Sequence, residues 1–391
     1  MGNLLFRKKF IIGLIVTLVL LTAVSINYAI GVDGPKVKGL SLQEATELAL
    51  KNNPDLELAK LAVDRAQVEY DAADDAAYIL YKSLKEGKNP ETYELGKVLS
   101  YYPVLRKNAL TLAEKQREFA EKKLMLDVEI AYYNVLKADK SLAIKREGLK
   151  YIQDQLKIAQ TGYKIGTRAK IDVTSMEANE ASYQAQVTSG ENDYRKAVME
   201  LDRITGLDLD TPVKLTTQFT VEKTGNSIKL DETIKEALAD NLDILRNKKS
   251  QESNEALYKV ADKYLGQGAT SYDTALIDVK IGKAGIRKQE LATTAAIKQS
   301  YLTIFNLEKS IDWQTKEVEK AKENARVFSL KYNAGLATAL EVRDANISLE
   351  KAQESLFGKT YDYNILKSQF KYGMFSGAGS MSSAGAAGYG Q

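Results

Sequence analysis

Two similar stretches interrupt the longest helical patterns of the chain: YKIGTRAKIDV (Tyr163 to Val173) and YNAGLATALEV (Tyr332 to Val342). Each places Tyr, Gly, an acid and Val in the same order within a run of helix-forming residues. A glycine in this setting supplies the positive φ with which a helix ends and the chain turns back. We therefore predict the tips of helical hairpins at Gly166 and Gly335. Ordinary helix ends that bind no partner would have the same sequence.

Before these turns, apolar residues recur every seven positions, as in coiled coils. An unbroken helix over residues 108–161 would be about 80 Å long, so we predict rods rather than a globule. In the first half of the chain, one series contains Val128, Val135, Leu142, Leu149 and Leu156, and another contains Leu124, Ala131, Ala138, Ile152 and Ala159, interrupted by Lys145. In the second half, the series is Ile297, Ile304, Ile311, Val318, Ala325 and Tyr332.

One unit also occurs twice in the chain. LSLQEATELALKNNPDLELA begins at Leu40 and IKLDETIKEALADNLDILRN begins at Ile228, and both carry an acid where a first helical turn would lie. We predict an all-α protein of two long antiparallel helical hairpins, repeat 1 over residues 40–206 and repeat 2 over residues 228–372. Residues 207–227 form a linker, and the Gly-, Ser- and Ala-rich residues 373–391 are expected to be disordered.

The N-terminus, residues 1–31, has the pattern of an export signal, in which Arg7, Lys8 and Lys9 precede an apolar run from Phe10. Cleavage after Ser25 would remove it, whereas a run extended to Ile30 is long enough to stay as a membrane anchor. In either case the protein is expected in the cell envelope. Without this segment the formal net charge falls from +3 to 0, which does not favour nucleic-acid binding.

The composition argues against catalysis. The chain of 391 residues has no His and no Cys, so the usual nucleophile–base pairs and most metal sites are missing. We expect no enzyme, no cofactor and no metal site. Trp313, the one tryptophan, lies in the middle of a predicted helix and is expected to be a packing residue.

These features together resemble the TolC-like outer-membrane efflux protein family. The similarity includes the two repeat starts, the tips YKIGTRAKIDV and NAGLATALEVRDA, and LDRITGLDL (Leu201 to Leu209) at the end of repeat 1. The resemblance implies a homotrimer that forms a helical duct. It also implies that the tips bind a periplasmic adaptor, or membrane fusion protein, coupled to an inner-membrane pump or ABC exporter. The tip residues that would dock the adaptor are Gly166, Thr167, Arg168, Gly335 and Leu336.

The resemblance also implies a pore constriction. Glu341 and Asp344 match acids that ring the pore in this family, and Tyr332 and Asp172 match a pair whose contact holds it shut. Glu341 and Asp344 are three residues apart and so share one helix face, where crowding in a trimer should raise some of the carboxyl pKa values. A solvated face near a helix start is the simpler explanation of the same acids. Ala337 departs from the family, which often has a basic residue there.

The membrane strands of the family look missing or shortened. A spanning strand needs about 9–11 residues of alternating apolar and polar side chains. The corresponding windows, residues 77–105 and 263–282, contain no such pair of strands.

Two classes of function fit this sequence. The first is a passive conduit subunit of an efflux or type I secretion system. The second is a structural coiled-coil scaffold of the envelope without a lumen, and an adaptor is a weaker third option. Polar side chains among the apolar series, such as Lys145, Gln153 and Gln160, favour a wet interior and therefore the conduit.

Overall fold

The computed structural model describes residues 38–84, 90, 92–209, 211–218, 221, 223 and 227–375. The predicted signal or anchor, residues 1–31, lies outside these ranges, as does the tail beyond residue 375. The chain forms two compact units, and the small one comprises residues up to Gly39 together with Pro212–Lys214. It contains most of a two-stranded sheet of β1 (Lys38–Leu40) and β2 (Val213–Leu215).

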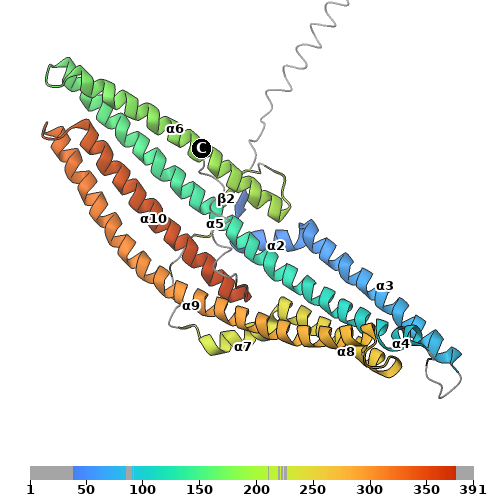
Figure 1. Ribbon diagram of the computed structural model, residues 1–391. Coiled ribbons are helices and arrows are strands. Elements are labelled where there is room, and N and C mark those ends of the chain that lie inside the picture. Colours follow the sequence, from blue (N-terminus) through green and yellow to red (C-terminus); the bar gives the residue numbers. More distant parts are fainter. Residues whose placement is uncertain are drawn as a thin grey trace, which may run out of the picture. The chain divides into compact units, whose positions relative to one another are not determined.

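The large unit is helical, which confirms the predicted all-α class. Figure 1 shows its helices as long rods. Their bounds are α2 Leu42–Asn52, α3 Pro54–Ser83, α4 Tyr93–Ser100, α5 Tyr102–Lys164, α6 Lys170–Thr205, α7 Leu230–Asp240, α8 Leu242–Tyr264, α9 Thr270–Asn333 and α10 Ala339–Tyr372.

The seven-residue apolar series form the seams between these helices. The buried members in α5 and α9 include Val128, Ala131, Val135, Leu142, Ile152, Leu156, Ala159, Ile297, Ile304, Ile311, Ala325 and Tyr332. The coiled-coil prediction is therefore confirmed.

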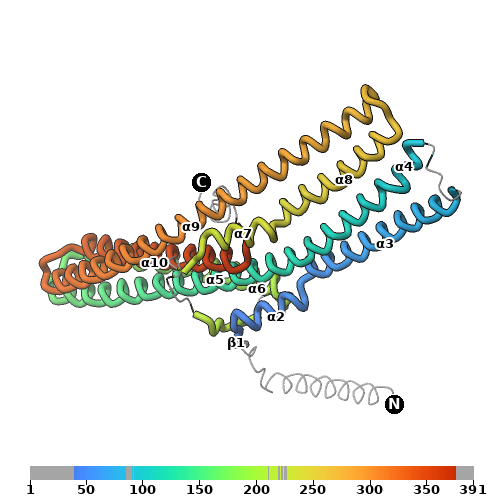
Figure 2. Tube along the Cα trace, turned by 90° about the horizontal axis from the view of Figure 1, so that it is seen from below, coloured from blue at the N-terminus to red at the C-terminus, as the bar shows by residue number. Residues whose placement is uncertain are grey.

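The longest helices change partners along their length. The 63 residues of α5 pack on α6 toward the hairpin tip and on α3 in the other half, and α9 packs on α10 and on α8 in the same way. Away from the tips, α3 packs on α5, α5 on α8 and α8 on α9, and Figure 2 shows these helices side by side in that order. This half of the large unit is therefore one layer of helices with α3 and α9 at its edges.

Both edges of this layer expose large apolar side chains. They are Leu58, Leu61 and Val68 on α3, and Leu291 on α9. Leu302 and Trp313 are also exposed, but on the part of α9 that packs on α10. Trp313 is 61% exposed, so it does not pack within the single chain. It follows the buried Ile311 by two positions, which turns it to the opposite side of the helix.

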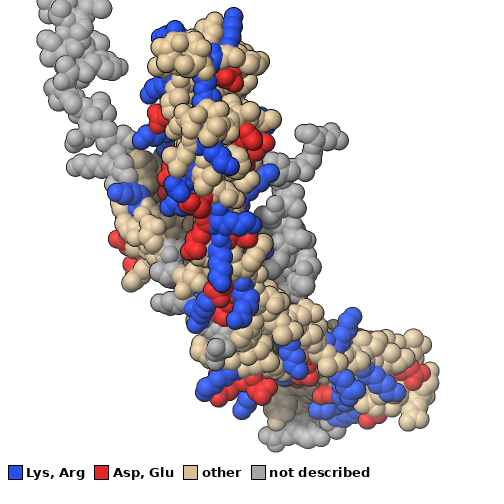
Figure 3. Space-filling view, turned by 90° about the vertical axis from the view of Figure 1, so that its left-hand side faces the viewer, with Lys and Arg blue, Asp and Glu red and all other residues tan. Residues whose placement is uncertain are grey.

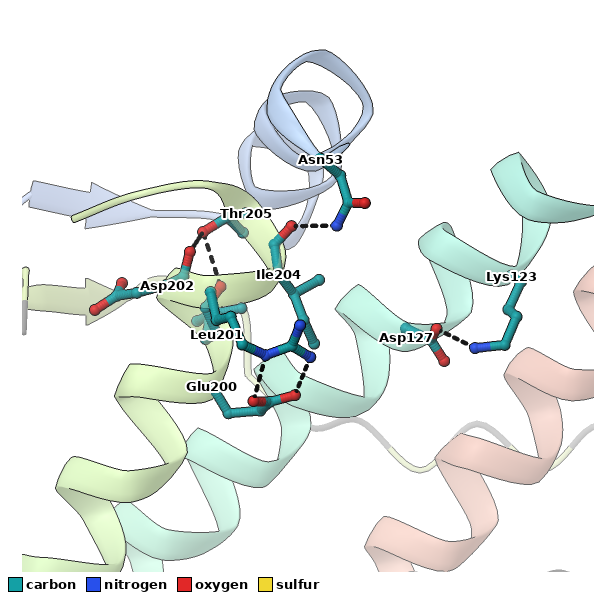
Figure 4. A network of polar contacts seen from close by, with 9 residues as sticks. Asn53, Lys123, Asp127, Glu200, Leu201, Asp202, Ile204 and Thr205 are labelled. Atoms are coloured by element: carbon teal, nitrogen blue, oxygen red, sulfur yellow. Dashed lines mark hydrogen bonds and ion pairs between the residues drawn. The ribbon is translucent and has the colours of Figure 1, made fainter. Parts of the chain in front are cut away.

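The motif at the end of repeat 1 joins α6 to the start of α3 (Figure 4). The Asn53 side chain accepts a hydrogen bond from the backbone of Asp55 and donates one to the Ile204 carbonyl at 3.2 Å. The Thr205 hydroxyl donates to the Leu201 carbonyl at 2.8 Å, and Gly206 then ends the helix at a φ of 71°. The LDRITG sequence is thus a structural joint.

A buried carboxylate ties the end of α10 to α5. Glu129 accepts hydrogen bonds from the Ser368 hydroxyl, from Lys371 Nζ at 2.8 Å and from the Tyr372 hydroxyl at 2.6 Å. Burial lowers the pKa of Lys371, but its hydrogen bonds to Glu129 and Tyr372 outweigh burial and raise the pKa to about 12. Lys371 is therefore charged at neutral pH.

A glycine cap ends α10. Gly373 caps α10 with a φ of 67°, and the amide of Met374 donates to the carbonyl of Gln369 at 2.9 Å. The described chain thus follows the end of α10 as far as Phe375.

The two windows without a predicted strand pair are largely helical. Residues 77–105 hold the end of α3, all of α4 and the start of α5, and residues 263–282 hold the short connection from α8 into α9. Among the described residues, β1 and β2 are the only strands. Within the same ranges, none of the helices combines the length and the apolar run needed to cross a bilayer.

The two hairpin tips have the same backbone turn. Gly166 has a φ of 78° and Gly335 a φ of 73°, which confirms the predicted left-handed conformation. The amide of Thr167 donates to the Gly162 carbonyl at 2.8 Å, and the equivalent bond in repeat 2, from Leu336 to Lys331, has the same length. Each turn therefore satisfies a carbonyl that the helix end leaves free.

We predict that Glu129→Ala lowers the free energy of unfolding by about 2 kcal/mol, because the buried Ser368 hydroxyl, Lys371 and Tyr372 lose their shared acceptor. Chemical denaturation monitored by circular dichroism measures this. Glu118→Ala is the control, since it removes an exposed acid of the same helix that forms only a surface ion pair, and it should change stability little. Equal effects of the two substitutions would contradict the role of the buried network.

We also predict opposite effects for two glycine substitutions in repeat 2. Gly335→Ala should destabilise the protein by about 1 kcal/mol, because an L-residue is strained at positive φ. Gly358→Ala, in the interior of α10 with open space around it, should stabilise by about 0.5–1 kcal/mol. The melting temperatures of the two variants test this, and a shift in the same direction for both would refute it.

Candidate functional site

The tips of the two hairpins pack against each other. A cluster of buried side chains from four helices joins them: Leu156 and Ala159 of α5, Met176 of α6, Tyr332 of α9, and Ala339 and Val342 of α10. The residues that the sequence placed at a tip and at a constriction are therefore brought to one end of the large unit, as Figure 1 shows.

Arg168 connects the two hairpins directly. Its guanidinium lies 4.0 Å from the centre of the Tyr332 ring and donates a hydrogen bond to the backbone carbonyl of Tyr332. A cation over an aromatic face is attracted by the ring, and the same charge is favourable beside carbonyls at the end of a helix. Arg168 thus caps the end of α9 from the neighbouring hairpin.

The structure does not show the expected contact between Tyr332 and Asp172 as a hydrogen bond. Asp172 instead accepts a hydrogen bond from the amide of Ala169 at 3.3 Å, at the start of α6. Within the described residues, the Tyr332 hydroxyl is buried without a hydrogen-bond partner. Burial raises the pKa of Tyr332, the charge of Arg168 lowers it, and the charge of Asp172 adds a smaller rise. Asp172 is therefore near Tyr332, but Arg168 makes the direct contact.

Glu341 and Asp344 lie on an exposed face of α10, while Val342 and Ala345 face the bundle. Glu341 accepts hydrogen bonds from the amide and the hydroxyl of Thr338, at 2.7 Å and 2.9 Å. These bonds lower the pKa of Glu341 in the single chain, opposite to the rise expected from crowding in a trimer. Asp344 pairs with the adjacent Arg343 at 3.1 Å.

Several apolar side chains at the tips are exposed to solvent, including Ile171 and Leu340. Leu336 is 78% exposed and Ile165 is 70% exposed. Leu336 was among the predicted docking residues, whereas sequence reasoning missed Ile165. The sequence did contain a signal, because Ile165 directly precedes the turn glycine, and the helix that ends at this point does not cover its side chain.

Charged side chains elsewhere on the surface show no patch of one sign on the face seen in Figure 3. Lys and Arg alternate there with Asp and Glu along the helices. Such a face does not offer the continuous basic stripe that nucleic-acid binding requires.

Comparison with solved structures shows the fold. The outer membrane channel CmeC of Campylobacter jejuni matches with a TM-score of 0.71 and 14% sequence identity, over 87% of each chain. The outer membrane protein VceC of Vibrio cholerae matches with a TM-score of 0.70 and 14% identity, over 86% of this chain and 96% of VceC. A search of curated protein sequences gave no match.

The sequence model described as "Outer membrane efflux protein" matches residues 105–207 and 264–366, more than half of the chain. These two segments correspond closely to the hairpins α5–α6 and α9–α10. The predicted resemblance is confirmed, and the chain belongs to the TolC-like outer membrane efflux protein family.

Proposed function

We propose that this protein is the passive conduit subunit of a tripartite efflux or type I secretion system and acts as a homotrimer in the cell envelope. The observation that carries this proposal is the arrangement of two copies of one hairpin as neighbours with their tips packed together. Further copies of the chain can pack beside such a unit in the same way as its two hairpins pack beside each other.

The edges of the helical layer support closure into a ring. The apolar residues of the α3 edge and of the α9 edge lie on different surfaces of the chain, so one edge would meet the other edge of the next copy. Contacts of this head-to-tail kind generate closed rings when the rotation between copies closes. Three copies would bury Leu58, Leu61 and Val68 of one copy against the α9 edge, with Leu291, of the next.

At the tips, exposed Ile165 and Leu336 flank the two turns formed by Gly166, Thr167, Arg168 and Gly335. These turns carry exposed apolar side chains on a defined backbone, and we propose that they bind the helical tip of an adaptor protein. Through the adaptor the duct would connect to an inner-membrane pump or an ABC exporter.

Glu341, Asp344, Tyr332 and Asp172 form the proposed constriction. In a trimer, six exposed carboxylates of Glu341 and Asp344 would surround one opening, and such a ring favours cations over anions. Tyr332 and Asp172 act behind this ring, where they help hold the two tips in place.

The alternative, a coiled-coil scaffold without a lumen, needs a solid apolar interior in the assembled particle. The buried residues of the helices include Gln155, Gln251, Thr293, Ser300 and Gln314. This mixture of polar and apolar buried residues fits a layer around a wet bore better than the centre of a dry bundle.

We predict that replacing Glu341 and Asp344 together by Ala increases the leak conductance of the reconstituted protein or lowers its preference for cations. Electrical recording in planar bilayers measures both. The double substitution Asp74→Ala and Asp75→Ala is the control, because it removes the same charge from exposed positions of α3. A tip variant that conducts like the unmodified protein would argue against the constriction.

A second prediction concerns the pH dependence of the constriction. The hydrogen bonds from Thr338 stabilise the ionised form of Glu341 and lower its pKa below the ordinary value of 4.5. This stabilisation of the carboxylate is lost as the pH falls through the pKa of Glu341 in the folded protein. Thr338→Ala should therefore move the loss of cation preference to a higher pH than in the unmodified protein.

Ser41→Ala is the matched control for Thr338→Ala. Ser41 and Glu44 form the same capping arrangement at the start of α2. Both substitutions should cost about 1 kcal/mol of stability, but only Thr338→Ala should move the pH profile. An unchanged profile for Thr338→Ala would show that Glu341 does not set the selectivity.

A further inference from the structure

The two tips are equivalent in sequence but not in surroundings. Gly335 follows Gly166 by 169 residues, and the same offset pairs Tyr163 with Tyr332 and Arg168 with Ala337. Tyr332 is completely buried, whereas Tyr163 is 48% exposed. The repeat 1 hairpin therefore covers the tyrosine of repeat 2, and in the single chain the tyrosine of repeat 1 has an open side.

Besides the apolar cluster around Tyr332, one polar residue of repeat 1 binds it. Arg168 stacks on the Tyr332 ring and donates to the Tyr332 carbonyl, which also accepts the amide of Gly335 at 3.0 Å. A side chain on Gly162 would obstruct this arrangement, because an added Cβ would lie 2.5 Å from Cγ of Arg168. The stem of Arg168 thus crosses the last turn of α5 where a glycine makes room for it.

The equivalent contact on the other side cannot form. In a ring, repeat 2 of one protomer would lie beside repeat 1 of the next protomer, in the same way as repeat 1 lies beside repeat 2 within a protomer. Position 337 of one protomer would then face Tyr163 of the next. Position 337 is an alanine, which has neither a charge nor the length to reach a neighbouring ring. Ala337 instead packs, half-buried, against the apolar cluster of its own protomer.

We propose that Arg168 latches the two hairpins of one protomer into a single moving unit, while Ala337 leaves the seam between protomers without a latch. The tips of the assembled ring then separate between protomers and not within them. This inference rests on the proposed function, because it requires a ring of copies. It assigns to Arg168 the role of a positioning residue that fixes Tyr332 and the start of the neighbouring α10.

Distance measurements between spin labels test this proposal. The chain has no cysteine, so Ile165→Cys and Leu336→Cys introduce the only two labelling sites, both exposed and outside the latch. Particles assembled from doubly labelled chains diluted in unlabelled ones report the distance within a protomer. Particles fully labelled at Leu336→Cys alone report the distance between protomers.

We expect a narrow distribution within the protomer and a broader one between protomers. Arg168→Ala should broaden the first, since losing the stacked cation raises the population of separated hairpins about fivefold. Arg168→Lys should have a smaller effect, because an ammonium lacks the planar guanidinium. Lys170→Ala, which removes an exposed charge at the same tip, should have none. Ala337→Arg should narrow the distribution between protomers and leave the distance within the protomer unchanged.

An unchanged distribution within the protomer after Arg168→Ala would overturn the latch. An unchanged distribution between protomers after Ala337→Arg would overturn the asymmetry of the two seams. A particle that contains only one chain would overturn the ring, and with it the proposed function, while the measurement within the protomer would still decide the role of Arg168.

Discussion

A continuous helix of more than 60 residues has to be covered along its whole length, and the rest of this structure follows from that constraint. At 1.5 Å per residue, α5 and α9 are each about 95 Å long, whereas α3, α6, α8 and α10 are much shorter. Isolated helices are marginal in water and depend on packing of their apolar face. Each long helix is therefore covered by one partner in one half and by another partner in the other half.

The change of partner explains why the joint near the middle of α5 is so heavily bonded. There α6 ends and α3 begins beside the same stretch of α5. The end of α6 and the start of α3 each leave backbone groups that have no hydrogen-bond partner within their own helix. The side chains of Asn53 and Thr205 donate hydrogen bonds to backbone carbonyls at the end of α6, and Gly206 ends that helix at positive φ. The same constraint leaves the layer open at α3 and α9, because none of the other helices in the described part of the chain covers these edges. We therefore place a second copy at those edges.

Much of this architecture could be predicted from the sequence, because it rests on local rules. The seven-residue period predicted the seams between helices. The glycines at 166 and 335 predicted the turns, because the chain reverses there through a residue with positive φ. Contacts between hairpins could not be predicted. The period says that Tyr332 is buried, but not that Arg168, 164 residues earlier, lies on its ring. Asp172 illustrates the same limit, because an acid at a helix start can cap its own backbone as well as contact a neighbour.

The exposure of Trp313 has a related cause. A large aromatic residue is usually expected to be buried. The seven-residue period of the α9 seam turns Trp313 away from the helices of its own chain, so only a neighbouring molecule could cover it. Electron micrographs of the purified native particle, averaged in views along its long axis, test the central claim most directly. We predict a ring of three copies around a solvent-filled centre. A filled disc, or a particle of one chain, would contradict it.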